Sequence, residues 1–229
     1  SFIRNDISLG TFIGPRQSAA GDFNDDGQAD LVVGTPTTAV SPAQMLILLG
    51  TGDGNFQAAP SVFVAQEPGS ILVRDFNNDG RQDLAATSFP ENLVAIRLGN
   101  GDGTFQAPLM ISTGNPPMSI AASDFDGDGT QDLAISIFLN GQNNARIYLG
   151  NGDGTFSQGQ EIVDGTRRAI SVGDFNRDGQ QDLAAIDFIF EDNRVLILLG
   201  QGDGTFQPVP EPSAVGPEAV RPRTSRGRS

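Results

Sequence analysis

Hydrophobic residues in this chain come in short runs that are bounded by Gly, Asp and Pro. Residues 31–33 (LVV), 45–49 (MLILL) and 195–199 (VLILL) are typical, and each run is long enough for one strand only. Apolar runs of this length between turn-forming residues are characteristic of strands buried in a sheet. No segment has the capped periodicity of a helix over about ten residues. The pattern therefore predicts an all-β protein.

The polar positions between these runs follow two motifs that recur about every 50 residues. The first motif reads DFNDDGQADL at 22–31, DFNNDGRQDL at 75–84, DFDGDGTQDL at 124–133 and DFNRDGQQDL at 174–183. The second reads LGTGDGNF at 49–56, LGNGDGTF at 98–105, LGNGDGTF at 149–156 and LGQGDGTF at 199–206. A fixed period of this size indicates an array built from one supersecondary unit.

One repeat divides into four strands. In the third copy we expect strand A at 119–123, an Asp-rich loop, strand B at 133–137, strand C at 145–149, a tight turn, and strand D from Phe156. Four strands in about 50 residues is the size of a β-propeller blade. We therefore predict a β-propeller of four four-stranded blades, with repeats at about 13–65, 66–114, 115–165 and 166–206.

The first residues match the middle of a repeat. Phe2 precedes Asp22 by 20 residues, much as Phe56 precedes Asp75 by 19. Residues 2–12 are therefore expected to form an N-terminal strand D that completes the last blade and closes the ring. Phe206 begins another candidate strand D, so one of the five is surplus and could pair with another subunit. The alternative is a fragment of a larger propeller.

The first motif places oxygen-bearing side chains at alternate positions 1, 3 and 5 and again at position 9, with Gly at position 6. Ca²⁺ takes six to eight oxygen ligands, and closely spaced carboxylates repel one another without a cation. Position 7 varies in type, as expected if only its backbone carbonyl binds. Polar Asx-rich turns without a metal are the alternative. The candidate ligands are Asp22, Asn24, Asp26, Gln28 and Asp30; Asp75, Asn77, Asp79, Arg81 and Asp83; Asp124, Asp126, Asp128, Thr130 and Asp132; and Asp174, Asn176, Asp178, Gln180 and Asp182.

These loops are not EF-hands, because position 12 is an apolar residue such as Val33 or Ile135 instead of Glu. They resemble the calcium loops of FG-GAP/VCBS repeats, the units of integrin α-subunit propellers. The resemblance extends over residues 2 to about 206. It implies one blade per repeat, with one Ca²⁺ held between strands A and B, and so up to four ions.

The second motif repeats an Asp that could be taken as catalytic: Asp53, Asp102, Asp153 or Asp203. We instead predict a β-hairpin turn, because Asp-Gly supplies the positive φ values of a type I′ turn. The Phe that follows would open strand D. The Phe at position 2 of the first motif is predicted to pack between blades in all four copies, as Phe23, Phe76, Phe125 and Phe175.

Composition narrows the chemistry further. There are 28 acidic and 14 basic residues, a formal net charge of −14, and neither Cys nor His; every basic residue is Arg. These absences exclude a thiol nucleophile, a Ser-His-Asp triad, a structural zinc site and a lysine Schiff base. The acidic body also argues against nucleic acid. The Pro- and Arg-rich segment 207–229 is predicted to be an extended tail, which docks on its own body or on a neighbouring copy.

Three functions are compatible with these features. The favoured one is a non-enzymatic extracellular calcium-binding scaffold with a structural, adhesive or self-assembling role, because open loops suit near-millimolar calcium. Its partners would be other copies of itself, or a cell-surface or matrix protein or glycan, with no membrane span. A lectin-like carbohydrate-binding module is the alternative, although sugar-stacking aromatics are scarce. A carboxylate-based hydrolase or lyase using Asp187, Glu191 and Asp192 is the third.

Overall fold

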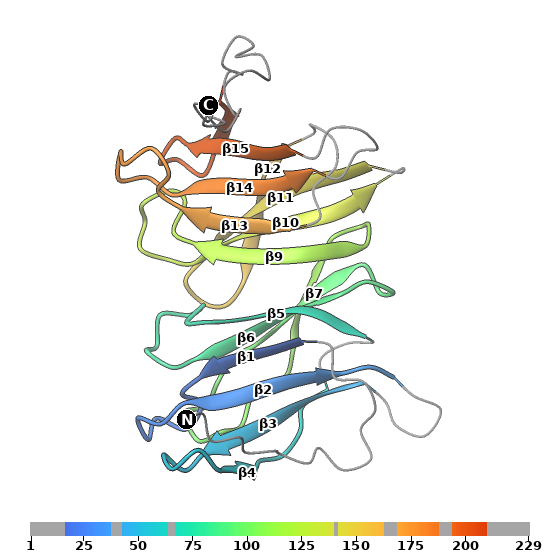
Figure 1. Cartoon of the computed structure of the whole chain (residues 1–229), viewed down its shortest axis with the longest axis vertical. Helices are drawn as coiled ribbons and strands as arrows, with labels where there is room; N and C mark the ends of the chain where they lie inside the picture. The colour runs from blue at the N-terminus through green and yellow to red at the C-terminus, as the bar shows by residue number, and fades with distance from the viewer. Residues whose placement is uncertain are drawn as a thin grey trace, which may run out of the picture.

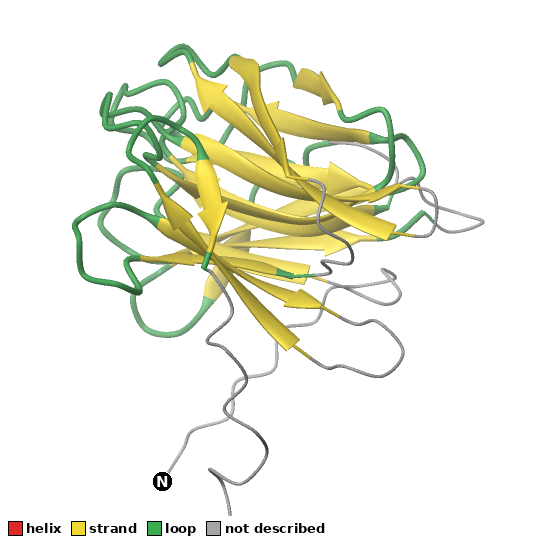
Figure 2. Cartoon of the chain, turned by 90° about the horizontal axis from the view of Figure 1, so that it is seen from above, coloured by secondary structure: helices red, strands yellow, loops and turns green. Residues whose placement is uncertain are grey.

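The structure is a computed structural model, and it describes residues 17–37, 43–63, 67–139, 142–162, 169–187 and 194–209. This part of the chain is all-β, as predicted: strands and loops make up the fold, and no helix is drawn in it (Figure 2). Its strands form four antiparallel sheets of four strands each. Every sheet comes from one repeat and keeps the chain order A, B, C, D from one edge to the other. Each sheet is therefore one propeller blade.

The blades are numbered 1 to 4 in chain order. Blade 1 contains β1 (Gln17–Gly21), β2 (Asp30–Thr35), β3 (Gln44–Gly50) and β4 (Phe56–Ala58). Blade 2 contains β5 (Pro68–Arg74), β6 (Asp83–Ser88), β7 (Leu93–Arg97) and β8 (Leu109–Ser112). Blade 3 contains β9 (Pro117–Ser123), β10 (Asp132–Leu139), β11 (Gln142–Gly150) and β12 (Phe156–Ile162). Blade 4 contains β13 (Ile170–Gly173), β14 (Asp182–Asp187), β15 (Arg194–Gly200) and β16 (Phe206–Pro208).

The four blades stack in chain order along the long axis of the molecule, with blades 1 and 4 at opposite ends (Figure 1). Their A strands lie next to one another in series: β1 contacts β5, β5 contacts β9, and β9 contacts β13. Within the described residues no comparable contact joins β13 to β1. This part of the chain is therefore an open arc of propeller blades and not a closed four-bladed ring.

The outer edge of blade 4 is occupied by β16, which pairs with β15 from Gly200↔Phe206 to Leu198↔Pro208. This is the place that the sequence pattern assigned to the N-terminal strand. The short connection 201–205 returns the chain directly to β15, so the edge is occupied by the local hairpin partner β16. Residues 2–12, like the tail from residue 210 onward, lie outside the described residues.

The hydrophobic cores lie between consecutive blades. The core between blades 1 and 2, for example, combines Val32 and Met45 of blade 1 with Leu84 and Ala86 of blade 2. Because side chains alternate along a strand, the intervening Ala85 faces blade 3 instead. A blade in the middle of the arc is thus covered on both faces, and β6 is buried at every position.

Aromatic residues mark each of these cores. Three edge-to-face pairs join the Asp-loop Phe of one blade to the Phe after the C–D turn of the next: Phe23–Phe105, Phe76–Phe156 and Phe125–Phe206, with ring centroids 5.6, 5.8 and 5.2 Å apart. The fourth Asp-loop Phe departs from the prediction. Phe175 is 50% exposed, because within the described residues no blade follows blade 4.

The strand D of blade 2 also begins later than predicted. Phe105 makes only an isolated bridge to Gly99, and β8 starts at Leu109. Pro108 comes directly before that start, and proline cannot donate a ladder hydrogen bond. In the other three blades strand D begins at the Phe, as expected.

Candidate metal centre

Each A–B loop folds around the side chains of its own Asp residues. The loops are loop 1 (22–30), loop 2 (75–83), loop 3 (124–132) and loop 4 (174–182). In loop 3, Asp124 Oδ2 accepts a hydrogen bond from the Gly129 amide at 3.0 Å, and Asp128 Oδ1 accepts one from the Thr130 amide at 2.7 Å. The same two bonds recur in the other loops at 2.8–3.0 Å. The position 6 glycine has a φ of +80 to +89° throughout, a conformation that other residues rarely adopt.

Position 9 ties each loop to the end of strand C. Asp30, Asp83, Asp132 and Asp182 are all fully buried. In each copy one carboxylate oxygen accepts the amide of the position 2 Phe, at 2.7–2.8 Å. The other oxygen accepts the amide of the Gly that precedes the C–D turn, at 2.7–2.9 Å. This Gly is the last residue of strand C in blades 1, 3 and 4, and in blade 2 it lies two residues after the end of β7.

The sequence pattern predicts position 9 only as a metal ligand, and it does not predict the hydrogen bond from the Gly amide. The Gly that precedes the C–D turn approaches the loop so closely that a Cβ at Gly50 would lie 2.2 Å from the Ala29 carbonyl oxygen. Equivalent contacts at the other three copies would be 2.3, 2.5 and 2.2 Å. The available signal was the Leu-Gly pair, which accompanies the position 9 Asp in every repeat.

Burial also shifts the pKa of two of the position 9 residues. Desolvation raises the pKa of Asp83 and of Asp132 to about 6, although two backbone amides donate to each carboxylate and oppose the shift. The nearby carboxylates of the same loop raise the pKa of both groups further. Ionising these groups at neutral pH is therefore costly unless a positive charge is nearby.

Loop 3 brings three predicted ligands together. Carboxylate oxygens of Asp124, Asp126 and Asp128 lie within 4.8 Å of one another. Among the described residues this is the group of acidic side chains that could hold a metal ion. The Thr130 hydroxyl donates to Asp128 Oδ1 at 2.7 Å, and this bond is the main cause of the lowered pKa of Asp128. Clustered carboxylate oxygens on a tight loop are the donor set that Ca²⁺ prefers. Asp132 is not part of this cluster.

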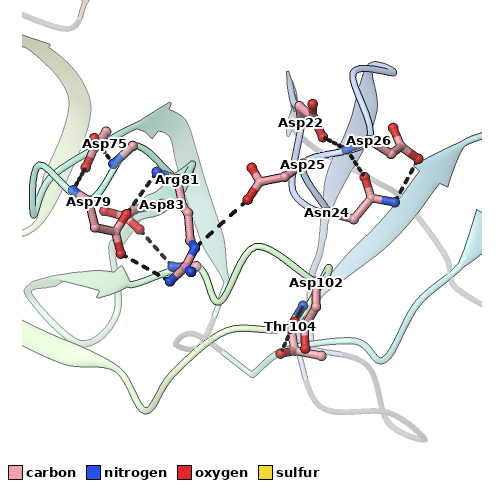
Figure 3. A network of polar contacts seen from close by, with 12 residues as sticks. Asp22, Asn24, Asp25, Asp26, Asp75, Asp79, Arg81, Asp83, Asp102 and Thr104 are labelled. Carbon is pink, nitrogen blue, oxygen red and sulfur yellow. Dashed lines mark hydrogen bonds and ion pairs between the residues drawn. The ribbon is translucent and has the colours of Figure 1, made fainter.

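The other three loops have Asn at position 3. Its amide group donates to the position 5 carboxylate, from Asn24 to Asp26 at 2.9 Å, with equivalent bonds of 3.1 and 2.7 Å in loops 2 and 4. Loop 2 also contains a fixed cation, because the Arg81 guanidinium lies 3.7 Å from Asp79 and 3.9 Å from Asp25 of loop 1 (Figure 3). Loop 3 has Asp at all four of positions 1, 3, 5 and 9, whereas each of the other loops has three Asp and one Asn there.

Position 7 supports its loop through both backbone and side chain. Its amide donates to position 5, and its side chain lies over the first Gly of the C–D turn in its own blade, so that a Cβ at Gly52 would lie 2.6 Å from Gln28 Oε1. The predicted role of its carbonyl as a ligand stays a prediction. The position 7 residues are Gln28, Arg81, Thr130 and Gln180.

The C–D turns use their Asp residues internally. Asp53 Oδ1 accepts bonds from the Thr51 hydroxyl at 2.5 Å and the Asn55 amide at 3.0 Å. These donors, the Thr51 hydroxyl first, lower the pKa of Asp53 to about 2. The turn is a five-residue loop, closed by Thr51 N–H to Asn55 O, with positive φ at Gly52 and Gly54. It is therefore longer than the predicted type I′ turn, and its positive φ values fall on the two glycines and not on Asp53.

Of the three acids of the hydrolase alternative, the structure describes Asp187 alone, so that alternative stays a prediction. Asp187 is the last residue of β14. Glu191 and Asp192 lie outside the described residues.

Comparison with known proteins agrees with this geometry. The model of the FG-GAP-like repeat matches residues 22–86, 75–135 and 136–185. The chain belongs to the FG-GAP-like repeat family. No curated protein sequence matches this FG-GAP chain. In the described residues no helix is long and apolar enough to cross a membrane.

A solved structure offers a looser likeness. The chain is similar to the structure described as BBS1N in complex with ARL6DN, soaked with lead, at 14% sequence identity and a TM-score of 0.38. The match covers 82% of this chain and 63% of the BBS1N chain. The FG-GAP chain therefore spans less than two thirds of the length of that relative.

Proposed function

We propose that this FG-GAP protein is a calcium-binding, non-enzymatic scaffold that acts outside the cell. The observation that carries the proposal is the cluster of Asp124, Asp126 and Asp128 in loop 3. Three carboxylates this close together repel one another at neutral pH, and a divalent cation would convert that repulsion into attraction. The FG-GAP assignment supports Ca²⁺ as the ion.

The loop is already shaped for such a ligand. Asp124 accepts one backbone amide on each oxygen, from Gly127 and Gly129, and Asp128 accepts the Thr130 amide on Oδ1. A carboxylate has about four lone-pair sites, so each group keeps acceptor capacity for an ion. Bound Ca²⁺ would supply positive charge and oxygen coordination. The three Asp side chains would hold it and so fix the first half of loop 3. An ion that binds only the folded state stabilises it, by about 2.7 kcal/mol at 100 times its Kd.

A structural role is also supported by the second motif. The Asp residues of the C–D turns accept turn donors in all four blades, where they shape the turn instead of facing a substrate. Open loops of this kind suit the near-millimolar calcium found outside cells. An adhesive or self-assembling role fits a molecule whose equivalent sites repeat along its length.

The test measures thermal unfolding and calorimetric binding with Ca²⁺ and with EDTA. We expect Ca²⁺ to raise the melting temperature of the wild type, and Asp124→Asn combined with Asp128→Asn to remove most of that increase. Asp25→Asn is the control, because it removes an exposed charge outside the cluster. An identical melting temperature in Ca²⁺ and EDTA would contradict the proposal.

A further inference from the structure

The C–D turns of blades 2 and 3 begin with the same dipeptide, Asn-Gly. The two turns lie in identical stretches of sequence, LGNGDGTF at 98–105 and at 149–156. Blade 1 has Thr51 and blade 4 has Gln201 at the first position of the turn. An Asn side chain that precedes Gly can react with the backbone, because Gly has no Cβ to hinder the approach of its own nitrogen to the side-chain amide. The repeat therefore places the same reactive pair in two neighbouring blades.

Both Asn-Gly pairs have an exposed side chain and an available backbone nitrogen. Asn100 and Asn151 are both exposed. In the described part of the chain neither the Gly101 amide nor the Gly152 amide donates a hydrogen bond. Each of these nitrogens can therefore lose its proton to solvent without breaking a hydrogen bond of the fold.

The side-chain nitrogen of each Asn is held by its own turn. Asn100 Nδ2 donates to Thr104 Oγ1 at 2.8 Å, and Asn151 Nδ2 donates to Thr155 Oγ1 at 2.9 Å. The backbone amides of the same two Asn residues donate to the carbonyls of these Thr residues, both at 3.0 Å. The two turns thus hold the Asn in the same way.

The two Asn side chains differ at the carbonyl oxygen. Ser157 of β12 donates from Oγ to Asn151 Oδ1 at 3.0 Å. The equivalent position in blade 2 is Gln106, and among the described residues no group donates to Asn100 Oδ1. A donor at a carbonyl oxygen stabilises the negative charge that develops there when a nucleophile adds to the carbon. Ser157 therefore makes the Asn151 side chain the more reactive of the two.

We propose that Asn151-Gly152 is a self-modification site, at which Asn151 is converted to aspartate or isoaspartate with the assistance of Ser157. The Gly152 nitrogen loses its proton to solvent and forms a bond to Asn151 Cγ. The bond from Cγ to Nδ2 then breaks, and this nitrogen takes up a proton from water and leaves as ammonia. Water opens the resulting succinimide at either carbonyl, which gives aspartate or isoaspartate at position 151.

The modification changes the surroundings of the candidate metal centre. Gly152 lies against loop 3, since a Cβ there would be 3.3 Å from Thr130 Cγ2. The Gly150 amide, just before Asn151, donates to Asp132 of the same loop. The modified turn therefore carries an additional negative charge beside loop 3. In the isoaspartate form the backbone between Gly150 and Gly152 is also longer by one carbon atom.

Peptide mass spectrometry tests the proposal on the folded chain 1–229, incubated in mildly alkaline buffer made with heavy-oxygen water. We expect Asn151 to lose its amide and take up labelled oxygen, and to do so faster than Asn100. In urea the two sites should react at equal rates, because their local sequences are identical and the contact from Ser157 is lost. The third Asn-Gly pair of the sequence, Asn140-Gly141, lies outside the described residues and is distinguished by peptide fragmentation.

Variants at the exposed Ser157 identify the contact that matters. Ser157→Ala should slow the conversion of Asn151 about two- to tenfold, the range expected for one exposed hydrogen bond, and leave Asn100 unaffected. Ser157→Thr retains a hydroxyl and should retain the fast rate, and melting temperatures check that both variants fold. Gln106→Ser is the matched gain of function and should accelerate Asn100. The proposal would be overturned by an Asn151 that keeps its amide while the urea-unfolded chain reacts, by equal rates at the two sites in the folded protein, or by a rate that Ser157→Ala leaves unchanged.

Discussion

Loops 2 and 3 share a backbone framework but differ in charge. Both place Asp at positions 1, 5 and 9, and both make the same hydrogen bonds to the position 6 and position 7 amides and to the end of strand C. Loop 2 has Asn77 and Arg81 where loop 3 has Asp126 and Thr130. Backbone amides therefore set the shape of both loops, whereas the side chains at positions 3 and 7 set how much negative charge faces a bound cation.

The largest expected effect concerns the buried Asp at position 9, which the two loops share. Asp83→Ala or Asp132→Ala leaves two buried backbone amides without acceptors, at roughly 1–3 kcal/mol each. We expect each variant to lower the free energy of unfolding by about 2–5 kcal/mol, equally in loops 2 and 3, in urea titrations with EDTA present. Losses below about 1 kcal/mol in both loops would show that position 9 does not support the fold as described.

The next largest expected effect is a loss of Ca²⁺ affinity, and it should differ between the two loops. Asp128→Asn in loop 3 removes one of three clustered carboxylates, and we expect at least a tenfold weaker Ca²⁺ affinity by calorimetry. Asp79→Asn in loop 2 changes the same position, but there Arg81 already lies near the carboxylate, so a smaller loss is expected. Equal losses in the two loops would mean that Arg81 does not influence the site.

Giving loop 2 the side chains that loop 3 has at positions 3 and 7 should give loop 2 the Ca²⁺ affinity of loop 3. Asn77→Asp combined with Arg81→Thr gives loop 2 the ligand positions of loop 3. We expect the number of Ca²⁺ ions bound with the affinity of loop 3 to rise by one in calorimetric titration. Asn77→Asp alone is the matched control and should give a weaker site, because Arg81 remains. An unchanged stoichiometry would place the controlling feature elsewhere in the loop.

The pH dependence of the calcium-free protein should again be common to both loops. The pKa of Asp83 and Asp132 in the folded state is about 6, above the ordinary value of 3.8, so folding favours their protonated forms. Their contribution to stability is full below pH 3.8 and is lost as the pH rises through 6. In EDTA we expect a higher melting temperature at pH 5 than at pH 7.5, and Ca²⁺ should reduce that difference. A higher melting temperature at pH 7.5 in EDTA would contradict it.

The sequence predicted much of this architecture because its signals are local and repeated. The spacing of the two motifs predicted the strands, and the third blade follows it closely, with β10 spanning Asp132–Leu139 around the expected 133–137. The second partner of Asp132 was missed because Gly150 is distant in sequence and its amide leaves no side-chain signal. The exposure of Phe175 was missed because its motif matches that of the buried Phe76. A repeat motif does not show whether a neighbouring blade is present.

The smallest expected effect concerns the ion pair that joins loops 1 and 2. The Arg81 and Asp25 side chains are 48% and 52% exposed and lie 3.9 Å apart, so solvent and salt screen their attraction. We expect Asp25→Asn to lower the free energy of unfolding by less than about 0.5 kcal/mol, and 1 M NaCl to remove even that difference. A loss of about 2 kcal/mol, insensitive to salt, would mean that this pair and not the apolar core holds blades 1 and 2 together.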